Sequence, residues 1–276
     1  MSSSEVLTWV ASELARGRRV ALITIIDKQG SGPRDVGAVM AVSSSGERRG
    51  TIGGGDVERI LVEEASKALQ EGKPRRVKVS LGAERAPSDA IPARALCGGV
   101  IEAFINVFNP RPRLILVGAG NVGKPIADVA NIVGYRVVVV DSKPELASPE
   151  RYPYAERVVA GSVVEEVEKL ELEEGDVAVI AYGEPEVDYQ VLKRLILKGF
   201  KGHIWALCSR RRASWMLERL QREGVNIEPF KGRIHAPAGL DIGSDTPEEI
   251  AISIWAEIIC EQRSCTKPVG SLSIFK

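Results

Sequence analysis

The sequence predicts an α/β protein in two parts: a C-terminal Rossmann-type parallel sheet with helices on both faces, preceded by a smaller α+β domain. Three observations predict this architecture. A glycine fingerprint lies between a strand pattern and a helix pattern, strand and helix patterns alternate after it, and two nearby prolines separate it from the first part of the chain. With 276 residues, 44% of them hydrophobic, the chain can form one large or two modest domains.

The first part of the chain mixes two helix patterns with short strand patterns. Apolar residues at helical spacing predict a helix over 5–16 with Ser4 as its N-cap, and another over 57–69 with Asp56 as its N-cap. Strand patterns, rich in β-branched residues and bounded by turn residues, cover 20–26, 38–42, 49–52, 76–81 and 100–107.

A linker follows, because Pro110 and Pro112 block the continuation of both helix and sheet. We therefore predict one domain over 1–109 and a second over 110–276. In the second, alternation predicts a parallel sheet whose strand order begins 3-2-1-4-5, with a ligand crevice at the carboxyl ends of strands 1 and 4. Its strand patterns cover 114–117, 137–140, 157–159, 177–181 and 204–207, and its helix patterns cover 122–133, 163–170, 185–197, 212–223 and 247–260.

The fingerprint consists of Gly118, Gly120 and Gly123, at the G-x-G-x-x-G spacing of a dinucleotide-binding turn. The first glycine permits the tight turn, the second lets a pyrophosphate approach the backbone, and the third allows close packing of helix on strand. Asn121 and Val122 open the helix, whose free N–H groups and positive dipole face the phosphates. This pattern predicts a Rossmann unit and a bound nucleotide.

Asp141 ends the strand after the fingerprint, 18 residues beyond its last glycine. An acidic side chain there accepts hydrogen bonds from a ribose 2′-OH and repels a 2′-phosphate, which favours NAD over NADP. Lys143 lies close enough to weaken that preference, and a solvated aspartate at a strand end is the alternative.

Three glycine-rich turns punctuate the first domain, and each ends or follows a predicted strand. If they cluster, their backbone N–H groups could face an anion, and Arg34 could add a bidentate fork for a phosphate or carboxylate. Three ordinary tight turns and a surface arginine are the alternative. The glycines concerned are Gly30, Gly32, Gly53, Gly54, Gly55, Gly98 and Gly99.

Two further residues are candidates for chemistry. Cys97 precedes two of these glycines; a thiolate there could relay sulfur or act as a nucleophile, and a buried inert cysteine is the alternative. His235 lies in a segment rich in glycine and proline before the last helix, where it is either a catalytic residue or a structural histidine. Thr246 and Pro247 then begin that helix with the pattern of a capping box.

Composition excludes several classes of function. Lys and Arg number 37, as do Asp and Glu, so no general nucleic-acid or membrane surface is indicated. No secretory signal pattern and no apolar run of membrane-spanning length occur, which predicts a cytoplasmic protein. The four cysteines form neither a disulfide framework nor paired C-x-x-C units, and two histidines cannot make a histidine-rich centre, so no metal site is expected.

These motifs together resemble the XdhC/CoxI family, the accessory factors of xanthine dehydrogenase and related molybdenum hydroxylases. The matching stretches run in the family's order over nearly the whole chain, and the one from Ile234 to Ile250 is the most specific. They are Gly30 to Gly37, Gly53 to Glu58, Cys97 to Glu102, Gly118 to Gly123 with Asp141, and Ile234 to Gly243 with Thr246 to Ile250.

The resemblance implies a dimeric chaperone for molybdenum cofactor rather than a catalyst with turnover of its own. Such proteins bind the molybdopterin, cooperate with a cysteine desulfurase that supports its sulfuration, and insert it into a hydroxylase apoenzyme of the xanthine dehydrogenase or CO dehydrogenase type. A dinucleotide form of the cofactor or a tungsten analogue fits the same description, and NAD remains a candidate ligand of the fingerprint.

One position departs from the family pattern, because Asp56 stands where many members have cysteine after the glycine turn. Thiol chemistry is therefore excluded there, and Cys97 remains the candidate thiol. The alternative function from another class is an NAD-dependent oxidoreductase that uses the same fingerprint, with His235 as its only candidate proton donor. A nucleotide-sensing module is a third interpretation.

Overall fold

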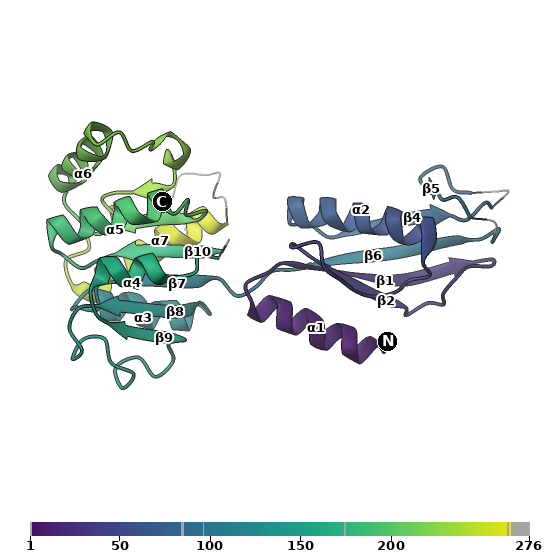
Figure 1. Cartoon of the computed structure of the whole chain (residues 1–276), viewed down its shortest axis with the longest axis horizontal. Helices are drawn as coiled ribbons and strands as arrows, with labels where there is room; N and C mark the ends of the chain where they lie inside the picture. Colours follow the sequence, from purple (N-terminus) through teal and green to yellow (C-terminus); the bar gives the residue numbers. More distant parts are fainter. Residues whose placement is uncertain (1, 84–85, 96, 174, 264, 266–276) are drawn as a thin grey trace, which may run out of the picture. The chain divides into compact units, whose positions relative to one another are not determined.

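A computed structural model describes residues 2–83, 86–95, 97–173, 175–263 and 265 of the chain (Figure 1). The chain divides into two compact units, Met1–Arg111 and Pro112–Lys276. Each unit has its own sheet and its own hydrophobic core, and each is described by itself below. None of the helices in these described ranges has the length and apolar character needed to cross a membrane.

The N-terminal unit is a six-stranded, mostly antiparallel sheet in the order β3-β2-β1-β6-β4-β5. Its two central strands pair along most of their length, with a register shift between Ile25 and Asp27. The short strand β5, which the sequence pattern did not predict, pairs parallel with β4 at one edge. The strands are β1 Val20–Gln29, β2 Val39–Ser43, β3 Arg48–Gly50, β4 Arg75–Ser80, β5 Ile91–Pro92 and β6 Val100–Phe108.

Helices α1 (Ser3–Ala15) and α2 (Gly55–Glu71) pack on opposite faces of this sheet (Figure 1). Both predicted N-caps are wrong. Ser2, two residues earlier than expected, caps α1 in a capping box with Glu5. Gly54 is the N-cap of α2, and Asp56 lies inside the first turn, where its carboxylate accepts a hydrogen bond from the Arg94 N–H at 2.7 Å.

The C-terminal unit confirms the predicted Rossmann order. Its six strands are all parallel and follow the order β12-β11-β10-β7-β8-β9, which is 3-2-1-4-5-6 in chain order read from the β9 edge. The strands are β7 Arg113–Val117, β8 Arg136–Asp141, β9 Arg157–Ala160, β10 Asp176–Ile180, β11 His203–Ala206 and β12 Ile234–His235. The two-residue strand β12 was not predicted, because it is too short to show periodicity.

Alternate residues of these strands face two different helix layers, so both faces are buried. Helices α3 (Gly123–Ile132) and α7 (Pro247–Gln262) cover one face with Trp205 and Trp255 in the core. Helices α4 (Val163–Lys169), α5 (Pro185–Leu197) and α6 (Arg210–Arg222) cover the other. The predicted capping box of α7 at Thr246 is confirmed.

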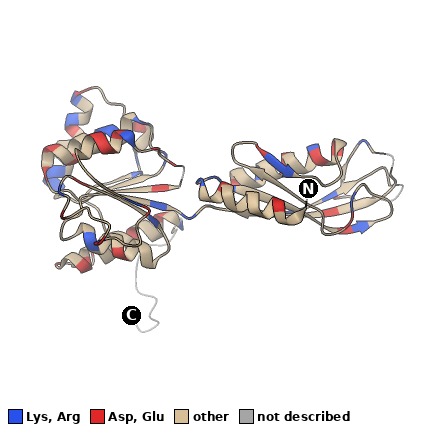
Figure 2. Cartoon of the chain, turned by 60° about the horizontal axis from the view of Figure 1, so that its bottom comes forward, with Lys and Arg blue, Asp and Glu red and all other residues tan. Residues whose placement is uncertain are grey.

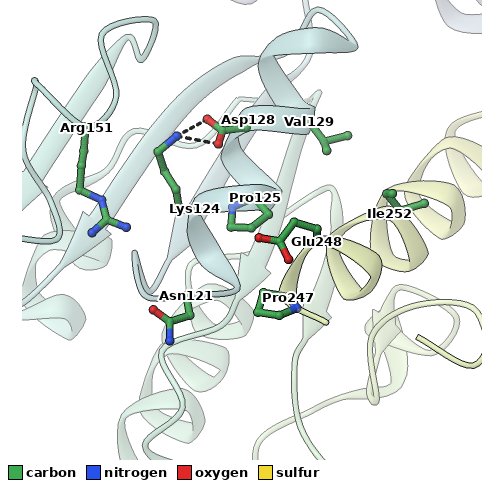
Figure 3. Close-up of a pocket in the computed structure, with 9 residues that line it drawn as sticks. All are labelled: Asn121, Lys124, Pro125, Asp128, Val129, Arg151, Pro247, Glu248 and Ile252. Atoms are coloured by element: carbon green, nitrogen blue, oxygen red, sulfur yellow. Dashed lines mark hydrogen bonds and ion pairs between the residues drawn. The ribbon is translucent and has the colours of Figure 1, made fainter. Parts of the chain in front are cut away.

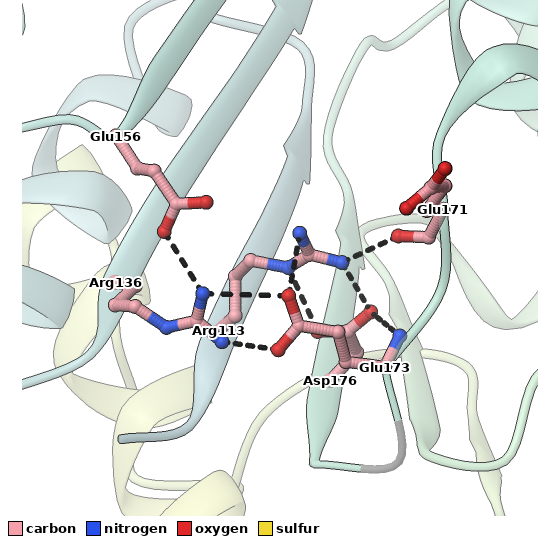
Figure 4. Close-up of polar contacts among 6 residues, drawn as sticks. All are labelled: Arg113, Arg136, Glu156, Glu171, Glu173 and Asp176. Atoms are coloured by element: carbon pink, nitrogen blue, oxygen red, sulfur yellow. Dashed lines mark hydrogen bonds and ion pairs between the residues drawn. The ribbon is translucent and has the colours of Figure 1, made fainter. Parts of the chain in front are cut away.

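A buried ion pair joins the amino ends of two central strands (Figure 4). Arg113 donates two hydrogen bonds to the carboxylate of Asp176, at 2.9 and 2.8 Å, and pairs with Glu173 at 3.0 Å. Arg136 pairs with the same Glu173 and with Glu156. The remaining charges are distributed more evenly: acidic and basic residues are interspersed over each unit, in keeping with a net charge of zero (Figure 2).

Candidate functional site

The three glycines of the fingerprint differ in what a side chain would contact at each position. Gly118 has a φ of +103°, and a Cβ there would lie 2.4 Å from the backbone of Ala181 and Tyr182. A Cβ on Gly123 would lie 2.0 Å from the Gly118 carbonyl oxygen. A Cβ on Gly120, however, would meet no described atom within 4 Å. The folded unit itself requires the first and third glycines, whereas the space beside Gly120 is available to a ligand.

The turn that follows Gly118 is held in place by side chains from the next crossover. The Ala119 N–H donates to Asp141 Oδ2 at 2.7 Å, and its carbonyl oxygen accepts from the Tyr152 hydroxyl at 3.3 Å and from Arg151 at 3.4 Å. Tyr152 is buried against the same core layer. The fingerprint is therefore preorganised by three side chains, of which sequence spacing singled out Asp141 but neither Arg151 nor Tyr152.

Asp141 ends β8 as predicted, but it is not the solvated aspartate offered as the alternative, because only 3% of its surface is exposed. Its second oxygen accepts from the Lys143 N–H at 3.0 Å, so both carboxylate oxygens already have main-chain partners. The hydrogen bond that its carboxylate accepts from the glycine turn explains why an aspartate stands at this position. A ribose contact by Asp141 remains a prediction, and it would require a lone pair that these two donors leave available.

A cavity of about 510 Å³ lies beside the amino ends of α3 and α7 (Figure 3). That volume is within the range of small-molecule pockets. Lys124 pairs with Asp128 one turn along α3, 2.6 Å from its Oδ2, and the Tyr154 hydroxyl donates to the same carboxylate. The lining residues are Asn121, Lys124, Pro125, Asp128, Val129, Arg151, Pro247, Glu248 and Ile252.

A second polar cluster lies at the carboxyl ends of β10 and β11. Asp188, 2% exposed, accepts from the Gly183 N–H at 3.3 Å and from Arg212 at 3.4 Å. Burial raises the pKa of Asp188 to about 6 against the opposing effect of these donors. Burial also raises the pKa of the neighbouring Cys208 thiol, so that cysteine is poorly suited to act as a thiolate.

The raised pKa of Asp188 predicts a specific dependence of stability on pH. The folded protein holds the proton up to about pH 6, whereas an unfolded aspartate loses it near pH 4, so this group's contribution to stability falls as the pH rises between those values. Urea unfolding of the wild type and Asp188→Asn at pH 4, 5, 6 and 7 should show a stability difference that changes by roughly 3 kcal/mol over this window. The exposed control Asp241→Asn should show no such change, and a constant difference for Asp188→Asn would contradict the assignment.

The structure brings the three glycine-rich turns of the N-terminal unit together. Ser31 and Gly98 form a parallel bridge, and a Cβ on Gly99 would lie 2.2 Å from the Ser31 carbonyl oxygen. A Cβ on Gly53, whose φ is +131°, would lie 2.3 Å from the ring of Pro33. The clustering condition stated from the sequence is therefore met, because each turn contacts another through a position where only glycine fits.

Glu58 accepts hydrogen bonds from main-chain donors that were predicted to face an anion. Its Oε1 accepts from the N–H groups of Ile52 at 3.0 Å and Gly54 at 2.8 Å, and from the Thr51 hydroxyl. Burial raises the pKa of Glu58, but these hydrogen bonds outweigh burial and the pKa is lowered overall. The Gly98 N–H likewise donates to the Leu81 carbonyl. An anion at this cluster would have to compete with Glu58 or bind the remaining groups.

Two of those remaining groups are Arg34 and Cys97, and both are exposed. Among the described residues, Arg34 makes no hydrogen bond and no ion pair. The alternative that Cys97 is a buried inert cysteine is wrong, because the turn carries it to the surface. A charged guanidinium and a thiol are thus both available to a ligand or a partner protein.

His235 lies away from the fingerprint. It belongs to β12 beside Trp205, in a partly buried cluster with His203 and Glu257. The contact between His203 and His235 could not be predicted from the sequence, since the two histidines are 32 residues apart and no spacing rule connects them. The oxidoreductase alternative thereby loses its candidate proton donor at the carboxyl ends of the strands.

Comparison with known proteins agrees with the fold. Residues 114–258 match the family model described as the XdhC Rossmann domain, and residues 13–80 match the one described as the XdhC and CoxI family. A solved structure from Bacillus halodurans, described as a xanthine dehydrogenase, is similar with a TM-score of 0.51 and 24% identity over 99% of this chain and 98% of that one. At this identity the likeness shows the fold alone.

Two curated proteins are also similar. The uncharacterized protein YqeB of Escherichia coli K12 is 39% identical over 243 residues, which are 87% of this chain and 43% of that protein. A Bacillus subtilis 168 protein, described as a probable subunit of xanthine dehydrogenase, is 30% identical over 156 residues, which are 56% of this chain and 44% of that protein. The chain thus spans less than half the length of these relatives. Because the Rossmann model alone matches more than half of its residues, the chain belongs to the XdhC and CoxI family.

Proposed function

We propose that this protein is an accessory factor that binds molybdenum cofactor, protects it, supports its sulfuration and inserts it into a hydroxylase of the xanthine dehydrogenase or CO dehydrogenase type. Family membership and the description of the Bacillus subtilis relative support this class. The observation that carries the proposal is the space beside Gly120, which nothing described in the protein fills. A cargo with a phosphate or pyrophosphate group explains a glycine that the fold does not need.

The described residues fit an anionic pterin as cargo. In the Rossmann unit, the amino end of α3 offers main-chain donors, and Lys124 and Arg151 line the adjacent cavity. In the N-terminal unit, Arg34 is exposed next to the glycine turns. We assign the fingerprint to the nucleotide end of a dinucleotide ligand, either a dinucleotide form of the cofactor or NAD, and competition between the two would distinguish them.

Cys97 is our candidate for the thiol that handles sulfur. Its exposure makes it accessible to a cysteine desulfurase, which we propose as a partner beside the target apoenzyme and a second copy of this chain. The protein then acts as a chaperone with no turnover of its own. His235 is not part of this proposal, because its ring nitrogens are both engaged in the cluster with His203 and Glu257.

The proposal is tested by incubating the full chain anaerobically with released molybdenum cofactor and measuring bound pterin by its fluorescence after oxidation. We expect about one pterin per chain and activation of a xanthine dehydrogenase apoenzyme. Arg34→Ala should weaken uptake roughly tenfold, since a charge-assisted hydrogen bond contributes about 1.5 kcal/mol or more. Absence of both uptake and activation would refute the function.

Cys97→Ala separates the role of the thiol from binding. We expect pterin uptake to persist while activation of the apoenzyme falls severalfold in the presence of a desulfurase. Cys265→Ala is the matched control, because it is also an exposed cysteine but lies outside the glycine turns. Equal activation by the wild type and by Cys97→Ala would show that Cys97 does not handle sulfur.

A further inference from the structure

The only two histidines of the chain meet at the edge of the Rossmann sheet. His203 opens β11 and His235 ends β12, and the parallel pairing of these strands sets Trp205 opposite His235. Nδ1 of His203 lies 3.0 Å from Nε2 of His235, with the two rings inclined by only 21°. Two imidazole nitrogens from different strands therefore point at the same place.

His235 is held in one orientation by a buried framework. Its Nδ1 lies 3.1 Å from Glu257 Oε1, and its ring stacks on Trp205 at a centroid distance of 4.5 Å. Glu257 is itself fixed, because its Oε2 accepts from the Trp205 indole N–H at 2.9 Å and the Gly239 N–H at 2.7 Å. With Glu257 accepting the hydrogen on Nδ1, the Nε2 of His235 presents a lone pair towards His203. Carboxylates orient metal-binding histidines in this way.

A third donor approaches from the last turn of α7. The carboxylate of Glu261, one turn beyond Glu257, offers an oxygen that lies within 4.8 Å of a ring nitrogen of each histidine. Glu261 is exposed and can change rotamer, whereas the histidines are partly buried. The three groups come from β11, β12 and α7, so a ligand that held all three would connect three elements.

We propose that His203, His235 and Glu261 form a binding site for a divalent transition-metal ion, with zinc as its first candidate. The ligands are His203 Nδ1, His235 Nε2 and a Glu261 oxygen, and water takes the fourth position. Imidazole nitrogens with one carboxylate suit zinc and its neighbours in the first transition row better than magnesium or calcium, which prefer oxygen ligands.

The distances are close to those that zinc needs. Tetrahedral ligands at about 2.0–2.2 Å from the ion stand about 3.3–3.6 Å from one another. The histidine nitrogens need to separate by only a few tenths of an ångström from their 3.0 Å contact, and the exposed Glu261 closes the remaining gap. Binding of the metal at Nδ1 of His203 requires the tautomer with its hydrogen on Nε2, so the hydrogen between the two rings moves to that nitrogen and no proton is released.

The surrounding charges are compatible with a cation. Arg233 is a nearby positive group, and it directs its guanidinium to the main-chain carbonyls of Pro229, Phe200 and Lys201. Glu257 and Glu261 supply two carboxylates on the α7 side. The site is remote in the sheet from the fingerprint turn, since His203 lies at the amino end of β11. We therefore expect a metal that stabilises the edge of the sheet, independent of the proposed cargo.

The test uses the full chain with Cys260→Ala and Cys265→Ala, so that neighbouring thiols do not bind the metal. After treatment with a chelator and its removal, Zn²⁺ binding is measured by equilibrium dialysis and the melting temperature by circular dichroism. We expect one ion per chain and a rise of about 5 °C at a zinc concentration 100-fold above Kd. Co²⁺ in place of zinc should give visible absorption bands of nitrogen and oxygen coordination.

The variants His203→Gln and Glu261→Gln should each reduce zinc affinity by at least tenfold and abolish the rise in melting temperature. Glu261 is exposed, so its variant should fold normally and keeps the test valid if His203→Gln does not fold. Glu248→Gln, at the other end of the same helix, is the matched control and should bind zinc as the parent does. No stoichiometric binding by the parent, or binding that survives both ligand substitutions, would overturn the proposal.

Discussion

Gly123→Ala is expected to destabilise the Rossmann unit by about 3 kcal/mol or more, a size typical of severe overpacking. The new Cβ would lie 2.0 Å from the Gly118 carbonyl oxygen and 2.9 Å from its carbon, and both belong to the backbone of the fingerprint turn. Neither can move without breaking the Gly118 N–H bond to the Val140 carbonyl or the contact with Ala181. Urea unfolding followed by tryptophan fluorescence measures the loss, because three of the chain's four tryptophans belong to this unit.

Gly120→Ala is the matched control from the same fingerprint. Because no described atom lies within 4 Å of its Cβ, we expect stability to change by less than about 0.5 kcal/mol. Binding of the dinucleotide ligand should nevertheless fall at least tenfold, because the methyl group fills the space that a pyrophosphate would occupy. Normal ligand binding by Gly120→Ala would show that the ligand does not lie against this glycine, and equal destabilisation by both variants would contradict the steric distinction.

Arg113→Met is the second substitution for which we expect a large effect, a loss of about 3–5 kcal/mol. The substitution leaves the carboxylate of Asp176, 1% exposed, without the two hydrogen bonds that balance its desolvation (Figure 4). It also removes the donor to the Glu171 carbonyl at 2.6 Å and a partner of Glu173. The free energy of unfolding, measured by urea titration at pH 7, should show this loss.

Two controls separate burial from the mere presence of an ion pair. Lys231→Met breaks the ion pair between Lys231 and Glu228, whose side chains are 71% and 69% exposed, respectively. This variant should lower the free energy of unfolding by less than about 1 kcal/mol. The double variant Arg113→Met with Asp176→Leu removes both buried charges and should recover much of the stability lost by the single variant. A single variant as stable as the wild type would mean that Asp176 finds other partners or takes up a proton without cost.

Much of the fold could be predicted because its signals are local. Runs of β-branched residues alternate with α-helices after the linker, and all of these helices except α4 have ten or more residues. This alternation is the pattern of a parallel sheet. The strand beginnings were less predictable. Arg113, Arg136 and Asp176 interrupt the apolar patterns, yet the structure includes them in strands because acidic and basic partners neutralise one another there.

The candidate site was predictable in part. The fingerprint, the glycine turns and the capping box of α7 follow from spacing, and the structure brings the three turns together. The donors that Glu58 occupies and the main-chain partners of Asp141 could not be read from spacing, because each depends on where a carboxylate is carried by a separate element. The exposure of Cys97 could not be predicted either, because it depends on how the turn that carries it is placed in the folded unit.

By itself, the sequence determined the two-part organisation, the Rossmann order and the resemblance to the XdhC and CoxI family, since these depend on periodicity and motif spacing along short stretches. Only the tertiary structure decided which glycines serve the fold and which leave space for a ligand, and only it brought together His203 and His235, which are 32 residues apart. The physical reason is that strand register and helix packing determine contacts between distant residues, and no local pattern records them.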